Sequence, residues 1–128
     1  MDSRRISDEY NRIAQELIDT RPELEDIKGG DVSIICLAST HEKKSGNKVV
    51  FGQCEKIAEK YKWGIPCDFT ITIFEPNVAG FTEEQLKILI FHELLHVGVD
   101  GARLFIRPHD LEDFKTIIEE FGVNWCEV

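Results

Sequence analysis

The chain has 128 residues, of which 42% are hydrophobic and 30% charged, a balance typical of one compact domain with a single core. We therefore expect residues 1–128 to form a single domain. The net charge is −9, and lysines and arginines are dispersed among acidic neighbours, so the basic face of a nucleic-acid-binding protein is missing. A neutral or cationic protein substrate suits this overall charge, although net acidity also serves solubility.

The N-terminal segment 1–10 is polar and lacks the apolar core of a secretion signal. No later apolar run reaches the length that crosses a bilayer, so we expect a cytoplasmic protein without a membrane partner. The cysteines form no Cys-x-x-Cys pair, which disfavours a zinc knuckle or a redox motif. Two disulfides are the alternative by number, but reduced and partly buried thiols fit this compartment better. The cysteines are Cys36, Cys54, Cys67 and Cys126.

Hydrophobic periodicity predicts one helix and two strands in the first half of the chain. Apolar residues recur at three- and four-residue steps over residues 3–19, the period of an amphipathic helix that Arg21–Pro22 would end. Residues 32–38 form an apolar run rich in β-branched side chains, as in a buried strand. A polar turn at 45–47 precedes a second apolar run at 48–54, and we expect these two strands to pair as a hairpin.

Residues 55–66 have a mixed pattern that predicts no single element, and a third strand and a strongly marked helix follow. Residues 68–75 alternate between apolar and polar side chains, which predicts a strand with one face in the core. Thr82 and Gln85 have the spacing of a capping box at a helix start. The helix that follows is apolar on nearly all sides up to Val97, and Gly98 is placed to end it.

A second helix start is visible near the C-terminus. Asp110 has the position of an N-cap, and an amphipathic pattern continues from it to Gly122. Taken together, the elements predict an α+β fold. In this fold a small three-stranded sheet packs against the N-terminal helix, the central capped helix and the C-terminal helix.

The central helix carries the sequence His92-Glu93-Leu94-Leu95-His96. Two histidines four residues apart lie one turn apart on the same helical face, where both rings can reach one tetrahedral ion. Glu93 is rotated by about 100° from His92 around the helix, so it can act as a general base instead of a ligand. The spacing therefore predicts a zinc site with His92 and His96 as ligands and Glu93 as the catalytic base.

A structural alternative assigns these residues no metal. His92 and His96 would then be core histidines and Glu93 a surface carboxylate. Burying imidazoles and a carboxylate costs several kcal/mol unless hydrogen bonds or a metal satisfy them. This cost favours the metal site.

A catalytic zinc site needs a third protein ligand and leaves a fourth position open. His109 is the next histidine, and it lies between Pro108, which restrains the backbone, and Asp110, the expected helix cap. Its alternative role is that of a loop histidine without a ligand function. The rival carboxylate ligands are Glu112, Asp113 and Glu119.

Two segments carry a resemblance to a known family. Residues 91–97, Phe-His-Glu-Leu-Leu-His-Val, followed by 108–114, Pro-His-Asp-Leu-Glu-Asp-Phe, resemble the phage metallopeptidase family and, more distantly, the SprT-like zinc peptidases. The strand 68–73 and the helix start 82–85 also fit the segments that precede the motif in that family. The resemblance covers roughly residues 48–121.

The resemblance implies a minimal zincin fold and a phage or prophage origin. It also implies that His92, His96 and His109 hold zinc, with Glu93 catalytic. The basic zinc-ribbon extension of the DNA-linked SprT proteins is missing from this chain, so no role in DNA repair is carried over.

These observations predict peptide-bond hydrolysis, in which Glu93 takes a proton from a zinc-activated water and returns it to the leaving amine. We expect the substrate to lie extended along the strand 68–75, as the edge of the sheet. The negative charge that develops on the scissile carbonyl oxygen needs a further hydrogen-bond donor. The candidates are Arg103, Arg107, His41 and Tyr61, and their spacing does not select one of them.

Two other functions remain possible from sequence. In the first, the zinc ion only ties helices together in a non-proteolytic module that binds a partner. In the second, a metal-dependent hydrolase acts on a substrate other than a peptide. An open fourth zinc position favours an enzyme, and a closed four-ligand site favours the interaction module.

Overall fold

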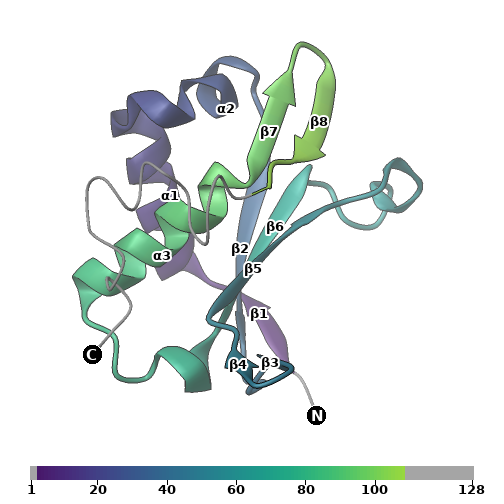
Figure 1. Cartoon of the computed structure of the whole chain (residues 1–128). Coiled ribbons are helices and arrows are strands. Elements are labelled where there is room, and N and C mark those ends of the chain that lie inside the picture. Colours follow the sequence, from purple (N-terminus) through teal and green to yellow (C-terminus); the bar gives the residue numbers. More distant parts are fainter. Residues whose placement is uncertain (1–2, 109–128) are drawn as a thin grey trace.

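The computed structural model describes residues 3–108, in which short strands alternate with helices (Figure 1). The strands are β1 (Arg4–Ile6), β2 (Ile34–Ser39), β3 (Lys44–Ser45), β4 (Lys48–Val49), β5 (Gly52–Lys56), β6 (Phe69–Phe74), β7 (Val97–Asp100) and β8 (Arg103–Ile106). The α-helices are α1 (Asp8–Thr20), α2 (Glu25–Gly29) and α3 (Glu83–Leu95). Short 3-10 turns are η1 (Pro22–Leu24), η2 (Glu59–Tyr61) and η3 (Glu75–Val78).

The main sheet has the order β1-β2-β6-β5, with β2 and β6 parallel and the two outer strands antiparallel to their neighbours. The predicted α+β class is confirmed, but the sheet has four strands instead of three. The additional strand β1 comes from the segment predicted as the start of the N-terminal helix. That helix begins at Asp8, because the Ser7 hydroxyl accepts a hydrogen bond from the Tyr10 backbone N–H at 3.1 Å.

The predicted hairpin between residues 32–38 and 48–54 is wrong. The corresponding strands β2 and β5 each pair with β6, which lies between them. All six side chains of β6 are buried, as expected of the strand at the centre of the sheet. The polar turn at 45–47 instead closes the short β3–β4 hairpin, where Gly46 has a φ of 63°.

The central place of β6 also contradicts the expectation that a substrate lies along residues 68–75. An extended peptide can add only to an unpaired strand edge, and β6 is paired on both sides. The alternation of its sequence suggested one solvated face. The threonine face is covered too, since the Arg4 guanidinium donates to the Thr72 hydroxyl at 3.4 Å.

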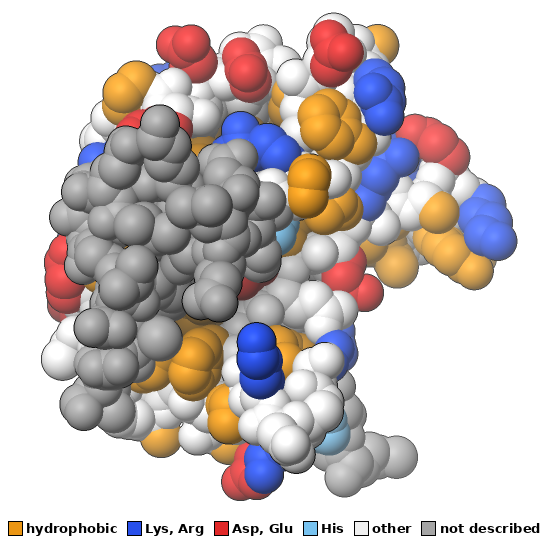
Figure 2. All heavy atoms as spheres, viewed as in Figure 1, with side chains coloured by type: hydrophobic (Ala, Val, Ile, Leu, Met, Phe, Trp, Pro, Cys, Tyr) orange, Lys and Arg blue, Asp and Glu red, His pale blue; other side chains and the backbone are white. Residues whose placement is uncertain are grey.

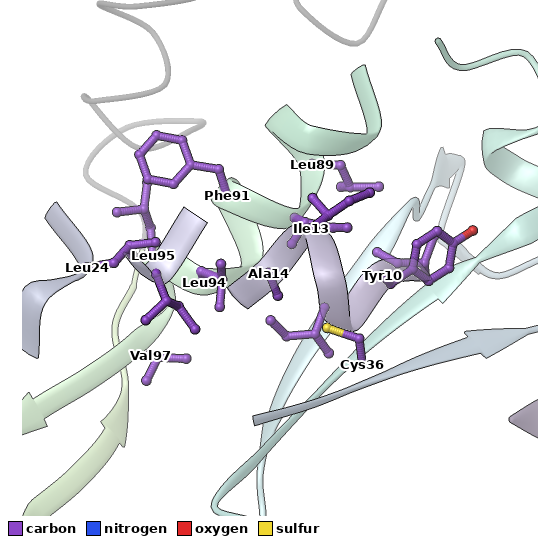
Figure 3. Packing of buried hydrophobic residues seen from close by; sticks show 14 of the residues in the cluster. Tyr10, Ile13, Ala14, Leu24, Cys36, Leu89, Phe91, Leu94, Leu95 and Val97 are labelled. Atoms are coloured by element: carbon purple, nitrogen blue, oxygen red, sulfur yellow. The ribbon is translucent and has the colours of Figure 1, made fainter. Parts of the chain in front are cut away.

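Helices α1 and α3 cover one face of the main sheet (Figure 1). The core lies between the helices and this face, where Ile13 and Ala14 of α1 pack next to Leu89 and Leu94 of α3 (Figure 3). Burial of these apolar side chains, each contributing about 1 to 3 kcal/mol, fixes α3 against the sheet.

The start of α3 is confirmed as a capping box. The Thr82 hydroxyl accepts from the Gln85 N–H at 3.2 Å, and the Gln85 side-chain oxygen accepts from the Thr82 N–H at 2.8 Å. The helix ends at Leu95, earlier than predicted, and the chain enters β7. Gly98 does not end the helix but lies in β7, where a Cβ atom would collide with the Phe105 ring.

Three further predictions concern the cysteines, membrane-spanning helices and the C-terminal helix. Cys36, Cys54 and Cys67 are free thiols, and the first and last of these are buried. In residues 3–108, no helix combines the length and the apolar character needed to cross a membrane. The predicted helix over 110–122 and Cys126 lie outside the described residues.

Candidate metal centre

The His-Glu-Leu-Leu-His motif occupies the C-terminal end of α3. His92 and Glu93 lie in the last turn, and His96 is the C-cap residue. His96 keeps helical backbone angles, with φ −73° and ψ −18°, so its ring stays on the same side of the helix as that of His92. The two ring centroids are 5.3 Å apart. The structure therefore brings the two predicted ligands together.

The His96 ring is oriented by the main chain that follows the β7–β8 hairpin. Its Nδ1 lies 2.7 Å from the carbonyl oxygen of Arg107. The Arg107 N–H also donates to the His96 carbonyl at 2.6 Å. A carbonyl oxygen can only accept, so Nδ1 carries the proton and the lone pair resides on Nε2. This is the outer-shell arrangement that prepares a histidine for metal ligation.

Glu93 is buried in the protein, with 4% of the residue exposed. Its Oε2 lies 3.9 Å from Nε2 of His92. Burial raises the pKa of the nearby Cys54 thiol, and the negative charge of Glu93 raises it further. Glu93 is therefore not the surface carboxylate of the structural alternative but a buried acid beside the candidate ligands.

Gly52, at the start of β5, faces Glu93. A Cβ atom at position 52 would stand 3.3 Å from Cγ and from Oε2 of Glu93. Side chains alternate along a strand, so Cys54 lies on the same side of β5 as Gly52. Within the described residues, β5 lies at one edge of the main sheet and packs beside α3. Of the two edge strands of the main sheet, β5 is thus the one that packs beside the helix carrying the motif.

The donor set fits zinc, because imidazole nitrogens on one helical turn are among its commonest ligands. Within residues 3–108, no group of three His, Cys, Asp or Glu side chains could hold a metal. A zinc site with three protein ligands would therefore need a donor from outside the described residues. The predicted ligand His109 and its rivals Glu112, Asp113 and Glu119 all lie outside the described residues.

The four candidate oxyanion donors lie in different places. The backbone of Arg107 is bonded to His96, as described above. Arg103 stacks on Phe105 at 4.9 Å from the ring centroid, in the β7–β8 hairpin. His41 packs edge-on against Phe74, with ring centroids 6.3 Å apart, and Tyr61 is 53% exposed in η2. Of the four, Arg107 is the one joined to the motif.

Two contributors to the site were missed from sequence. The Arg107 carbonyl gives no signal in a sequence, because every residue carries a carbonyl group. Gly52 does give a weak signal, since a glycine within a strand pattern often marks the close approach of another group. The identity of that group became visible only in the fold.

One comparison with known proteins gives a match. The model of a family described as "Putative phage metallopeptidase" matches residues 4–128. This match includes the first third of the chain, for which no motif was quoted above. No curated protein and no solved structure matches the chain.

Proposed function

The chain belongs to the phage metallopeptidase family, and we propose that it is a zinc-dependent peptidase with Glu93 as general base. In this proposal His92, His96 and His109 hold the metal. The observation that carries it is the bond from His96 Nδ1 to the Arg107 carbonyl, which prepares Nε2 as a ligand one turn from His92.

When bound, zinc in such a site supplies a Lewis acid that polarises a carbonyl group and lowers the pKa of water. The protein supplies the base and its position. Glu93 accepts the proton of the attacking water and returns it to the leaving amine. Its burial against Gly52 and β5 holds the carboxylate in one place, which preserves the geometry that proton transfer requires.

The position of Arg107 supports His109 as the third ligand. The Arg107 backbone is bonded to His96, and His109 follows only two residues later. Two residues of extended chain span at most about 7 Å, so chain connectivity makes His109 a candidate for the same site. Glu112 is three residues further along the chain, and its reach depends on the course of those residues.

We propose that the substrate adds to the β5 edge instead of to the strand at 68–75. An unpaired edge offers main-chain N–H and C=O groups to an extended peptide. The carboxylate of Glu93 lies against the first residue of this strand, so a bound peptide would pass close to the base.

Incubation with a diverse peptide library tests the proposal. Zinc-loaded protein should generate new peptide termini that mass spectrometry detects, and the same protein treated with a chelator should not. A protein that binds zinc tightly but cleaves none of the peptides would instead be a zinc-stabilised interaction module.

A further inference from the structure

The cations of the described residues fall into two groups. Those of β1, of residues 8–31 and of α3, together with Lys62, lie within ion-pair distance of a carboxylate. These paired cations are Arg4, Arg5, Arg12, Arg21, Lys28, Lys62 and Lys87. A second group has no carboxylate partner within residues 3–108, and it comprises Lys43, Lys44, Lys48, Lys56, Lys60 and Arg103.

Apart from Lys60 in η2, the cations of the second group lie in or beside β5 and the two hairpins. Lys44 and Lys48 are exposed in the β3–β4 hairpin that leads into this strand, and Lys56 is its exposed last residue. The Lys43 ammonium bonds to the side chain of Gln53 in β5. Arg103 is exposed in β8, which packs beside β5. Unpaired positive charge therefore flanks the strand edge next to Glu93.

Carboxylates do not cancel this charge locally. Residues 41–56 contain four lysines and two glutamates. One of these glutamates, Glu55, is 3.6 Å from the guanidinium of Arg4, and the other is Glu42. By contrast, residues 8–31 contain eight acidic and three basic residues. The helical side thus contributes strongly to the net charge of −9, whereas the β5 side is locally positive.

Figure 2 shows basic side chains distributed over the face that carries β5 and the two hairpins. Clefts and edges lined by one sign of charge concentrate ligands of the opposite sign. The overall charge alone suggested a neutral or cationic substrate. The local charge at the proposed binding edge favours an acidic one.

We propose that the β5 edge selects acidic polypeptide segments, with Lys44, Lys48 and Lys56 as the residues that recognise their carboxylates. The cleavage of such a segment rests on the proposed peptidase function, but its binding does not. Single-stranded nucleic acid is a different class of polyanion that the same charges attract. A peptide fits better because an open strand edge offers the main-chain hydrogen bonds that another extended polypeptide can complete.

Binding to the full-length, zinc-loaded Glu93→Gln variant tests the proposal without cleavage. The probes are a fluorescein-labelled peptide rich in Asp and Glu, and the same peptide with Asn and Gln in their places. Anisotropy should show the acidic peptide bound about tenfold more tightly at low ionic strength, because exposed charges are weakly screened there. The preference should fade as salt is added.

Lys44→Gln, Lys48→Gln and Lys56→Gln, combined in one protein, should remove the preference. The matched control combines Arg12→Gln, Lys28→Gln and Lys87→Gln, which removes the same charge from cations on the helical side. The control should keep most of the preference. Circular dichroism and thermal melting establish that both triple variants are folded before binding is compared.

Equal binding of the two peptides, or equal losses in the two triple variants, would overturn the proposal. Tighter binding of a single-stranded DNA oligomer than of the acidic peptide at equal charge would also overturn it. A charge preference without cleavage by the wild-type protein would refute the peptidase function and leave the surface assignment standing. Cleavage without a charge preference would refute the surface assignment alone.

Discussion

Gly52 of β5 lies against the carboxylate side chain of Glu93 in α3, although the two residues are 41 positions apart in sequence. The distance of 3.3 Å from an added Cβ to Oε2 of Glu93 is tighter than ordinary van der Waals contact. Ile73 stands at the same distance on the neighbouring strand, so the added atom has no free space. The missing side chain at position 52 therefore allows β5 and the carboxylate of Glu93 to approach each other.

Gly52→Val should displace Glu93 and lower kcat by roughly 10- to 100-fold, since small misplacements of a catalytic group have effects of this size. KM and zinc content should change little, because the atoms nearest to an added Cβ belong to Glu93 and Ile73 and not to a histidine. Steady-state kinetics and elemental analysis measure these quantities. Gly64→Ala is the control, because nothing lies within 4 Å of its added Cβ.

A stability measurement separates this contact from a general packing defect. The loss of melting temperature caused by Gly52→Val should be smaller in a Glu93→Ala background, where the opposing side chain is short. If the loss is the same in both backgrounds, Gly52 does not act through Glu93.

His109→Ala should weaken zinc binding by more than the roughly 10- to 100-fold that loss of an outer-shell partner causes. Glu112→Ala should change it little, because we propose that Glu112 is not a ligand. Competition with a chromophoric chelator measures both affinities. The reverse ranking would assign the third ligand to a glutamate.

Glu75, the first residue of η3 after β6, is bonded to a residue of β1 and to a residue of α1. The Arg5 guanidinium donates to it at 2.8 Å and holds the pKa of Glu75 below its ordinary value, and the Tyr10 hydroxyl donates at 3.0 Å. A pKa lowered by folding adds stability at neutral pH, and this stability is lost as the pH falls through the folded-state pKa. The contribution is therefore present above the ordinary glutamate pKa of about 4.3.

Glu75→Gln should lower the free energy of unfolding at pH 7 by about 1 kcal/mol, because the side chain is partly exposed and its ion pair is screened. The difference from the wild-type protein should shrink as the pH falls below the ordinary glutamate pKa of about 4.3, toward the lower folded-state pKa at which the native glutamate becomes protonated. Urea denaturation at several pH values tests this. A difference that does not vary with pH would contradict the role of charge at this residue.

Local signals in the sequence located the start of the helix that carries the motif, and the two histidines on it. The capping box at Thr82 and Gln85 depends on residues three positions apart, and the pairing of His92 with His96 depends on one helical turn. Both are determined by short-range geometry. Their positions could therefore be predicted without knowledge of the fold.

Strand partners and distant contacts could not be predicted in this way. The run 32–38 and the run 48–54 each looked like half of a hairpin, but both strands pair with β6, which comes later in the chain. The periodicity of a strand indicates its faces and not its neighbours. For the same reason, the sequence identified neither Glu93 as the neighbour of Gly52 nor Arg107 as the partner of His96.

Glu93→Gln should keep the fold and the zinc but lower peptide hydrolysis by at least about 100-fold, the lower range of general base catalysis. The amide preserves the size of the side chain but cannot accept a proton from water. Turnover and metal content are measured on the same sample. A variant that loses its zinc would show that Glu93 is a ligand or a support of the site.

The most direct test of the zinc site is the metal content of the wild-type protein, purified without chelators and measured by elemental analysis. Two histidines on one helical turn and one further ligand predict about one zinc ion per chain. No metal in the purified protein, and none taken up when zinc is added, would contradict the zinc site and the peptidase function that depends on it.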